Sequence, residues 1–427
     1  MIIRIPKFNY QNAASLLLGL LLAFSFTGLS PFSTSSGLDI ELSDTGGGSF
    51  ARQIIFIFFF GGALAIFLKK QNVSELQKIP LLLLFMGWCF LSIFWADHPA
   101  ISVRRVALLL ITVSTIFMLI SCMTLDQTII CITRVLATLV IISLIAMPVL
   151  PGAVHTGAEL FDTGLEGNWK GIFIHKNHAG PALMVAISLF LYQYYHKRSY
   201  VWLVLVFLAF IFLVFTKSKT SIALLMPSLM FGYLLYKTLH LKSFSNIVGI
   251  IYICILSLLF ILREPIIDSF VSILDNPEAF TGRATIWDII LRAIQDHFWF
   301  GIGYGSVWSV GEDMLVAEYA FGWVDWVFTL THAHNGYLEV LISLGIIGLT
   351  LCLATFVIMP FFKAVSLSNS SVHPFMFLFF SSFLFFTLHN MLETDFLNAT
   401  DGRWFLILIF YFTLYLKGSE LKQKRSW

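Results

Sequence analysis

Charge is scarce in this chain. Only 12% of its 427 residues are Asp, Glu, Lys or Arg, whereas 58% are hydrophobic and 44 are Phe. A soluble core cannot bury so many apolar side chains. The sequence therefore predicts a polytopic membrane protein. The formal net charge of +2 gives no indication of a nucleic-acid partner, and none is expected.

Cysteine and cofactor motifs are also sparse. Every cysteine lies within an apolar run, and no two have CxxC spacing: Cys89, Cys122, Cys131, Cys254 and Cys352. Disulfides and a metal site are therefore not expected. The Gly-rich run at residues 301–305 has no strand before it and no Lys-Ser/Thr after it, so it is not a nucleotide loop. We expect no cofactor.

Long apolar runs, in contrast, are abundant. A helix needs about 20 apolar residues to cross a bilayer, and the candidate runs are centred near residues 21, 60, 87, 113, 138, 187, 207, 229, 254, 345, 384 and 409. Because the runs are continuous rather than alternating, they predict helices. The expected fold is all-α, with about 12 transmembrane helices and a long outer loop between spans 9 and 10.

This pattern divides the chain into three parts. Residues 1–263 hold spans 1–9 with short loops, residues 264–333 form the long outer loop with an amphipathic helix, and residues 334–427 hold spans 10–12 and a basic tail. The first apolar run has no cleavage site after it and is interpreted as an uncleaved first span.

Basic residues indicate the orientation of the spans. With the N-terminus inside, most Lys and Arg fall on the cytoplasmic side. A minority lies outside: Arg52, Arg104, Arg105, Lys170, Lys176, Lys217, Lys219, Arg263, Arg283, Arg292 and Arg403. Snorkelling to lipid head groups is sufficient to account for Arg52 and Arg263. For the others, the alternative is an anionic ligand at the outer face.

Three outer segments have the composition of such a site. Lys170, His175, Lys176 and His178 follow Trp169 and could hold a phosphate beside a sugar ring, although an interfacial anchor has the same composition. A short turn after the seventh span carries Lys217 and Lys219, either as phosphate ligands at a helix N-terminus or as a charged hairpin tip.

The third segment is residues 283–297, which predict an amphipathic helix on the membrane surface with Thr281 as its N-cap. The loop that follows combines tryptophans with carboxylates, a pattern typical of carbohydrate binding and also of interfacial loops. These residues are Trp308, Glu312, Asp313, Glu318, Trp323, Asp325 and Trp326. A last outer segment carries His389, Glu393, Asp395, Asp401 and Arg403.

In their order and loop placement, these motifs resemble the O-antigen ligase and Wzy polymerase superfamily, in particular the exopolysaccharide polymerases similar to ExoQ. The matching residues are Gly171-Ile172-Phe173 with His175-Lys176-Asn177, Lys217-Ser218-Lys219, Thr281-Gly282-Arg283 with Trp287, Gly301-Ile302-Gly303-Tyr304-Gly305, and His334-Asn335-Gly336-Tyr337-Leu338-Glu339 with Gly345 and Gly348. The resemblance covers residues 165–400 as an order of motifs.

The resemblance implies a metal-independent glycosyltransferase of the bacterial inner membrane, with its active site at the periplasmic face. Its partners would be a glycan linked to undecaprenyl diphosphate, an acceptor glycan, the lipid bilayer and, as a further candidate, a chain-length regulator. It implies His334 and Arg283 as functional residues. The turn after span seven has Lys217 and Lys219 where many members have Ser-Arg, and lysine lacks the bidentate fork of arginine.

Together these observations predict a set of site residues. The catalytic candidates are His334, as the general base, and Arg283; the substrate-binding candidates are Lys217, Lys219, Lys176, His175, Lys170, Asn335, Trp287 and Arg292; and the further candidates are His332, Glu339, Glu393, Asp395 and Arg403. Asn335 would orient the ring or the sugar. If the tenth span begins by His334, Glu339 would hold its imidazole in one tautomer.

Three functions remain open at this point. A polymerase of repeat units and a ligase that transfers a finished glycan to lipid A core share their chemistry, and the histidine-lysine segment favours the polymerase. A secondary transporter is a third class. It is disfavoured because the charged residues gather in outer loops rather than at mid-membrane depth.

Overall fold

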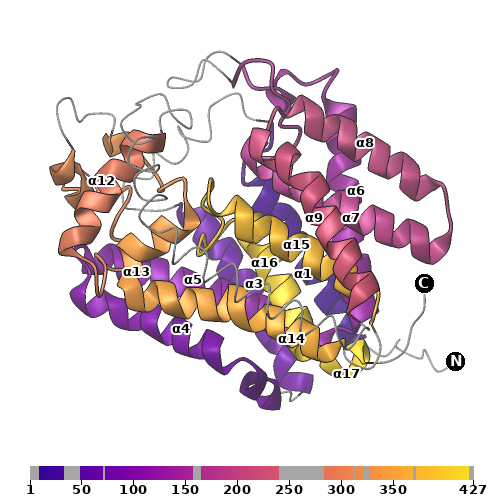
Figure 1. Ribbon diagram of the computed structural model, residues 1–427, viewed down its shortest axis with the longest axis horizontal. Helices are drawn as coiled ribbons and strands as arrows, with labels where there is room; N and C mark the ends of the chain where they lie inside the picture. The colour runs from indigo at the N-terminus through magenta and orange to yellow at the C-terminus, as the bar shows by residue number, and fades with distance from the viewer. Residues whose placement is uncertain are drawn as a thin grey trace, which may run out of the picture.

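The protein is a bundle of helices (Figure 1). The computed structural model describes residues 9–32, 49–70, 73–156, 165–239, 283–311, 313–320, 327–368 and 372–422. The helices are α1 (Tyr10–Thr27), α3 (Phe50–Lys70), α4 (Pro80–Leu91), α5 (Pro99–Cys122), α6 (Leu125–Ala146), α7 (Lys176–Lys197), α8 (Val201–Phe215), α9 (Lys219–Thr238), α12 (Arg283–Asp296), α13 (Gly336–Leu353), α14 (Met359–Leu367), α15 (Phe375–His389), α16 (Gly402–Leu416) and α17 (Gly418–Leu421).

A helix lies at each predicted span position that the structure describes. The ninth, near residue 254, lies outside the described residues. Among the described helices, α1, α3, α5, α6 and the segment Gly336–Leu367, which is kinked at Gly345, are long and apolar enough to cross a membrane. The apolar helices Pro80–Trp95, α8, α15 and α16 are shorter. A polytopic helical membrane protein is thus supported, and the number of twelve spans stays a prediction.

Hydrogen bonds between distant segments define the two ends of the bundle. At one end, where α12 and residues 327–335 lie, Ile174 N–H donates to the carbonyl of Phe26 (3.1 Å) and Trp169 N–H to that of Phe215 (3.0 Å). We call this the loop end. At the opposite end, the Lys70 ammonium donates to the carbonyl of Ser121 (3.1 Å). Alternate helix termini thus meet at the same end, as an up-and-down bundle requires.

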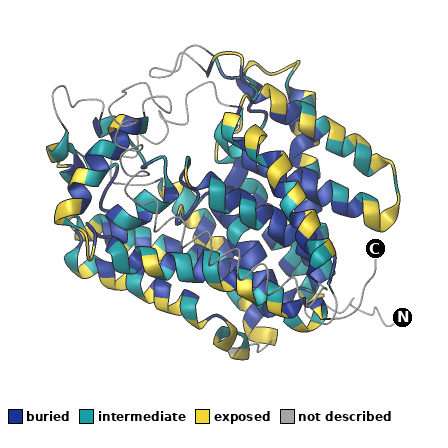
Figure 2. Cartoon of the chain, in the orientation of Figure 1, coloured by how far each residue is buried: buried dark blue, intermediate teal, exposed yellow. Residues whose placement is uncertain are grey.

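The core sits around α16. Its residues from Gly402 to Leu414 are nearly all buried, and its neighbours include α1, α5, α7 and α15. Figure 2 shows the buried surfaces gathered there, whereas α3, α4 and α8 carry exposed faces. Those faces are apolar, with Phe58, Phe94 and Phe207 largely uncovered. In a bilayer such side chains face lipid, where exposed apolar surface does not carry the free-energy cost that it has in water.

Helix α12 is amphipathic, as its periodicity predicted, and begins at Arg283. Its apolar face was expected to lie on the membrane surface. Instead, Ile286, Ile290 and Ile294 are buried in a second apolar cluster with loop residues such as Trp308. The loop from residue 297 onward supplies enough apolar side chains to cover this face. The protein therefore binds α12 to itself, and the first residue of the helix is held at a fixed place.

Candidate functional site

The loop of residues 390–401, between α15 and α16, carries several acidic groups at the loop end. Asn390 is buried and determines the shape of this loop: its side-chain oxygen accepts the backbone N–H of Asp395 (3.0 Å) and of Phe396 (3.1 Å). Such side-chain bonds satisfy backbone groups after the helical pattern has ended at His389. The loop is therefore a fixed part of the fold.

Gly336, the first residue of α13, joins this loop to the tenth predicted span. Its N–H donates to the carbonyl oxygens of Asn390 (2.7 Å) and Glu393 (3.0 Å). A Cβ at this position would overlap the Asn390 side chain, so only glycine allows the approach. The residues just before α13 are consequently held against the loop that carries Glu393.

Glu393 is the centre of the candidate site. Its Oε1 lies 2.6 Å from Nη2 of Arg283 and accepts a hydrogen bond from Nδ2 of Asn177 (3.2 Å). Nη1 of Arg283 donates to the carbonyl oxygen of Leu392. The first residue of α12, the start of α7 and the 390–401 loop therefore meet at one carboxylate, although they are distant in the sequence.

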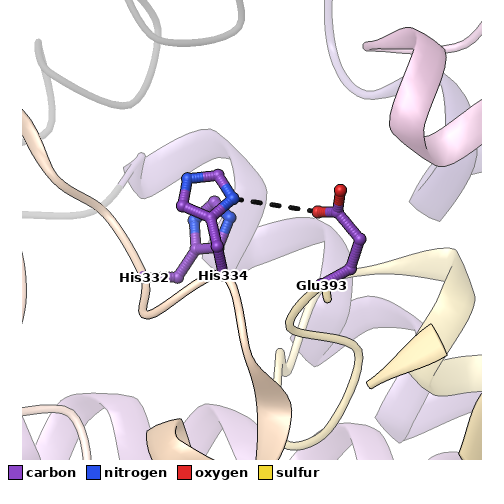
Figure 3. A group of neighbouring side chains, drawn as sticks. All are labelled: His332, His334 and Glu393. Carbon is purple, nitrogen blue, oxygen red and sulfur yellow. Dashed lines mark ion pairs between the residues drawn. The ribbon is translucent and has the colours of Figure 1, made fainter. Parts of the chain in front are cut away.

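His334 occupies the other side of the same carboxylate. Its Nδ1 lies 3.9 Å from Oε2 of Glu393, beyond hydrogen-bond distance, and this buried nitrogen has no hydrogen-bond partner among the residues that the structure describes. The backbone of His334 is left-handed, with φ 50°, which few residues other than glycine adopt. Figure 3 shows the imidazole next to that of His332, with the ring centroids 4.1 Å apart, and a dashed line toward Glu393. We call Arg283, Glu393, Asn177, His334 and His332 the Glu393 cluster.

The histidine-lysine segment packs beside this cluster. Nδ1 of His175 accepts the N–H of Asn177 (3.1 Å) and so caps α7, while Nε2 of His155 accepts the N–H of Lys176 (3.2 Å). The His155 and His175 rings are 4.7 Å apart. Two histidines thus fix the first turn of α7, which brings Asn177 to the carboxylate. Lys176 is half-buried there and Lys170 is buried.

The turn after α8 lies against the same segment. The Trp169 ring stacks on Phe215 at 4.3 Å, directly before Lys217 and Lys219. Both lysines are exposed at the loop end, and α9 begins at Lys219, close to the predicted start. The Ser218 side chain bonds Ser221 rather than capping the helix, so the turn offers two cations beside a helix N-terminus.

The electrostatics of the cluster favour a charged carboxylate at Glu393. Burial raises the pKa of Glu393, but His334 and the Arg283 guanidinium together lower it by more. The pKa of Glu393 is therefore well below its ordinary value. Burial and the neighbouring His334 hold the pKa of His332 well below its ordinary value. Burial and His155 do the same for the pKa of His175.

A second ionic group lies deeper in the same loop. Asp395 lies 3.0 Å from Nη1 of Arg403 and 2.7 Å from Nδ1 of His389, and Arg403 is also 2.6 Å from Asp401. His178 lies 3.5 Å from Asp401. Burial raises the pKa of Asp401, but Arg403 lowers it to about 2. We call these five residues the Asp395 network.

The structure gives the contacts of two predicted residues next to His334. Helix α13 begins at Gly336 rather than at His334, so Glu339 does not face the imidazole. Glu339 instead accepts hydrogen bonds from the Trp308 indole (2.9 Å) and from Ala333 N–H (2.8 Å). Asn335 was expected to orient the ring or the sugar. Its side-chain oxygen caps α13 and its Nδ2 donates to the carbonyl of Met391 (3.0 Å).

Other predicted site residues divide between supporting and remote positions. The buried Trp287 donates its indole N–H to the carbonyl of Ala333 (3.0 Å), which holds the loop before His334. Arg292 is exposed and pairs with Asp288 (2.9 Å) one turn away on α12, so the structure does not bring it to the cluster. Thr281, Glu312, Trp323, Asp325 and Trp326 lie outside the described residues.

His332, His334 and Glu393 also offer ligand atoms that lie within 4.8 Å of one another, so they could converge on a metal ion. The donor set argues against a permanent one. Arg283 already neutralises Glu393 at 2.6 Å, and Nδ1 of His332 is 2.8 Å from the Thr331 hydroxyl. A cation would have to displace or repel the guanidinium. That no metal is required therefore stays a prediction.

Several residues of the site were not predicted as site residues from the sequence. Asn177 was noted only as part of a motif and His178 only within the phosphate-binding segment after Trp169, and His155 and Asp401 were assigned no role. His155 stands alone in a loop, and its contact with His175 depends on the tertiary fold. The only available signal was that Asn177 and Asp401 are polar residues at the outer ends of apolar runs.

Comparison with known proteins bears on the middle of the chain. A family model described as O-antigen ligase matches residues 204–353, which include α9, α12 and the loop that ends in His334. No curated protein matches the chain. The matched region thus contains Lys217, Lys219, Arg283 and His334, whereas Asn177 and Glu393 lie on either side of it.

Proposed function

We propose, from the match of residues 204–353 to a family model described as O-antigen ligase, that this chain is a membrane glycosyltransferase acting on undecaprenyl diphosphate-linked glycans. It transfers the glycan to a hydroxyl of an acceptor sugar and so polymerises repeat units of an exopolysaccharide, capsule or O-antigen. One observation carries the assignment of the site: Arg283 and His334 converge on Glu393 from opposite sides.

The bundle lies in the bacterial inner membrane with its loop end toward the periplasm. The distribution of basic residues supports this orientation, because Lys69, Lys70 and Lys78 lie at the opposite end from the Glu393 cluster. A carrier lipid in the outer leaflet would then present its diphosphate at the depth of the loop end. No energy source is needed there, since the donor carries its own activation.

Arg283 binds the diphosphate of the donor. Arginine matches phosphate oxygens with a planar fork and stays charged. In the ligand-free protein that fork is held by Glu393 and by the carbonyl of Leu392. An arriving diphosphate competes for the guanidinium and neutralises the charge that develops as the leaving group departs. Lys217 and Lys219, exposed on the neighbouring turn, supply further positive charge.

His334 is the general base. The acceptor oxygen attacks the anomeric carbon, the bond from that carbon to the diphosphate oxygen breaks, and the proton of the acceptor hydroxyl passes to His334. The products are a new glycosidic bond and undecaprenyl diphosphate. When the donor draws Arg283 away, Glu393 can close the 3.9 Å gap to Nδ1, which leaves Nε2 to accept the proton.

The test is transfer by purified protein in nanodiscs, with a lipid-linked repeat unit as the only glycan. A ladder of products on a gel is the expected result. Transfer only when lipid A core is added would instead identify a ligase. Absence of transfer with either acceptor, by protein with a normal unfolding temperature, would contradict the proposed function.

Orientation has its own test, in a variant without native cysteines. An impermeant thiol reagent should label Gln295→Cys, exposed on α12, in intact cells. Lys78→Cys, exposed before α4, should react only after lysis. The reverse pattern would place the site in the cytoplasm and exclude the proposed donor.

A further inference from the structure

A cavity of about 290 Å³ lies beside the Glu393 cluster at the loop end. Its walls come from the start of α3, the start of α5, the loop after α12 and the loop before α16. Its volume is close to the lower end of the range of about 300 to 1,000 Å³ that is typical of small-molecule sites. Nothing in the proposed transfer step uses the α3 and α5 walls.

One wall of the cavity is held in place by an arginine. Nη1 of Arg105 donates to the carbonyl oxygens of Gly305 (2.6 Å) and Trp308 (2.7 Å), and Nη2 donates to that of Ser309 (3.1 Å). A Cβ at position 305 would overlap the Arg105 side chain, so the close approach requires glycine there. Charge-assisted bonds to three carbonyls fix the loop on α5, so the cavity is a built feature of the fold.

Two further arginines line the cavity with their charge uncompensated. Arg52, on α3, and Arg104, on α5, are half-buried. Across the residues that the structure describes, neither guanidinium has a hydrogen bond or an ion pair. Glu339 is the acidic residue of the lining, and it is already bonded to the Trp308 indole and to Ala333 N–H. The cavity therefore has an excess of positive charge.

The remaining lining is that of a carbohydrate site. Trp308 and Tyr304 offer aromatic surface, and Asn398, Thr400 and Ser309 offer polar groups that can bond hydroxyls. His332 also lines the cavity, and its ring is 4.1 Å from that of His334. A sugar in the cavity would thus lie next to the proposed base.

We propose that this cavity is the acceptor subsite, and that Arg52 and Arg104 bind the carboxylate of an acidic sugar in the acceptor glycan. This inference rests on the proposed function, which it deepens by naming the class of acceptor. The acidic sugar anchors the acceptor so that a neighbouring hydroxyl faces His334. Snorkelling to lipid does not account for Arg52, because its side chain lines the cavity.

The test measures binding rather than transfer, so that it does not depend on the enzymatic activity. Saturation-transfer NMR would compare glucuronic acid, glucose and inorganic diphosphate on the full chain in nanodiscs. The variants are Arg52→Gln, Arg104→Gln and the double variant, each checked by its unfolding temperature. Arg292→Gln, which changes an exposed arginine remote from the cavity, is the matched control.

We expect glucuronic acid to bind more tightly than glucose. Each single variant should weaken glucuronate binding by about tenfold, since one charge-assisted bond is lost. Arg292→Gln should bind as the unchanged protein does. Equal binding of glucuronate and glucose, or unchanged binding in the folded double variant, would overturn the proposal. Arginine-dependent binding of diphosphate without glucuronate would also overturn it, in favour of a second carrier lipid as the ligand.

If the chain bound glucuronate through Arg52 and Arg104 but transferred no glycan, the subsite would stand and the proposed reaction would fail. If the unchanged protein transferred glycan but bound glucuronate no better than the double variant does, the reaction would stand and the subsite would fail. The two results separate the two proposals.

Discussion

The Glu393 cluster and the Asp395 network both include carboxylates of the 390–401 loop, yet they differ in access. The side chain of Arg283 is 16% exposed and that of His334 28%, whereas Arg403 is 5% exposed and Asp395 is completely buried. Every partner in the network is within 3.5 Å. A closed network fixes a shape, whereas an open one can exchange a protein partner for a ligand.

The difference in exposure predicts that mutations in the two groups have different effects. Loss of His334 from the open cluster should affect turnover and leave the fold intact. Loss of a residue from the closed network should affect the fold first, because a buried charge is left without its partner.

The largest effect is expected from His334→Ala. Removal of a general base typically lowers a rate by about 100- to 10,000-fold, and the side chain has no hydrogen bond whose loss would destabilise the fold. The measurement is polymer formed per minute by purified protein, together with its unfolding temperature. His332→Ala is the control and should be milder. Near-normal turnover by His334→Ala would exclude the role of base and leave Glu393 as the next candidate.

The second-largest effect is expected on the free energy of unfolding. Arg403→Ala leaves Asp395 and Asp401 without their common cation, and breaking a buried pair in this way costs about 3 to 5 kcal/mol. Arg292→Ala breaks an exposed pair on α12 and should cost about 1 kcal/mol or less. Thermal unfolding in detergent compares the two. Equal unfolding temperatures for the two variants would remove the distinction between closed and open groups.

Arg283→Lys should lower turnover by about ten- to a hundredfold although it keeps the charge. Lysine cannot make the bidentate contact, and one charge-assisted hydrogen bond is worth about 1.5 to 3 kcal/mol. Lys219→Arg, at the exposed turn, should be tolerated. Arg292→Lys is the matched control on the same helix. Full polymer production by Arg283→Ala at normal protein level would remove Arg283 from the site.

Acid should destabilise the protein modestly through His332. Its pKa is lowered in the folded state by burial and by His334, so the unfolded chain takes up this proton first. The stability due to neutral His332 is complete above the unfolded pKa of about 6.5. It is lost as the pH falls from there toward the folded pKa. Unfolding temperatures at pH 7.5 and 5.5 should therefore differ less in His332→Gln, and an unchanged difference would contradict this assignment.

The smallest effect is expected from metal removal. Because Arg283 neutralises Glu393, a chelator should leave turnover unchanged within experimental error. Activity that is lost with the chelator and restored by a divalent cation would show that His332, His334 and Glu393 hold an ion. The open cluster would then be a metal centre rather than an exchangeable ion pair.

Much of the fold could be predicted because its signals are local. Apolar runs placed the helices, and the spacing of Ile286, Ile290 and Ile294 placed α12. The site was predictable where a motif marked it, as at Arg283 and His334. The role of Glu339 depended on a helix that included His334, and the left-handed backbone there excludes this.

The sequence by itself determined that this is a helical membrane protein whose charged residues are concentrated between the apolar runs, since hydrophobicity and charge act residue by residue. Only the tertiary structure decided that Glu393 is the centre of the site and that Arg52 and Arg104 face a common cavity. Those contacts join segments separated by the apolar helices between them. They depend on how the helices pack, which no local pattern encodes.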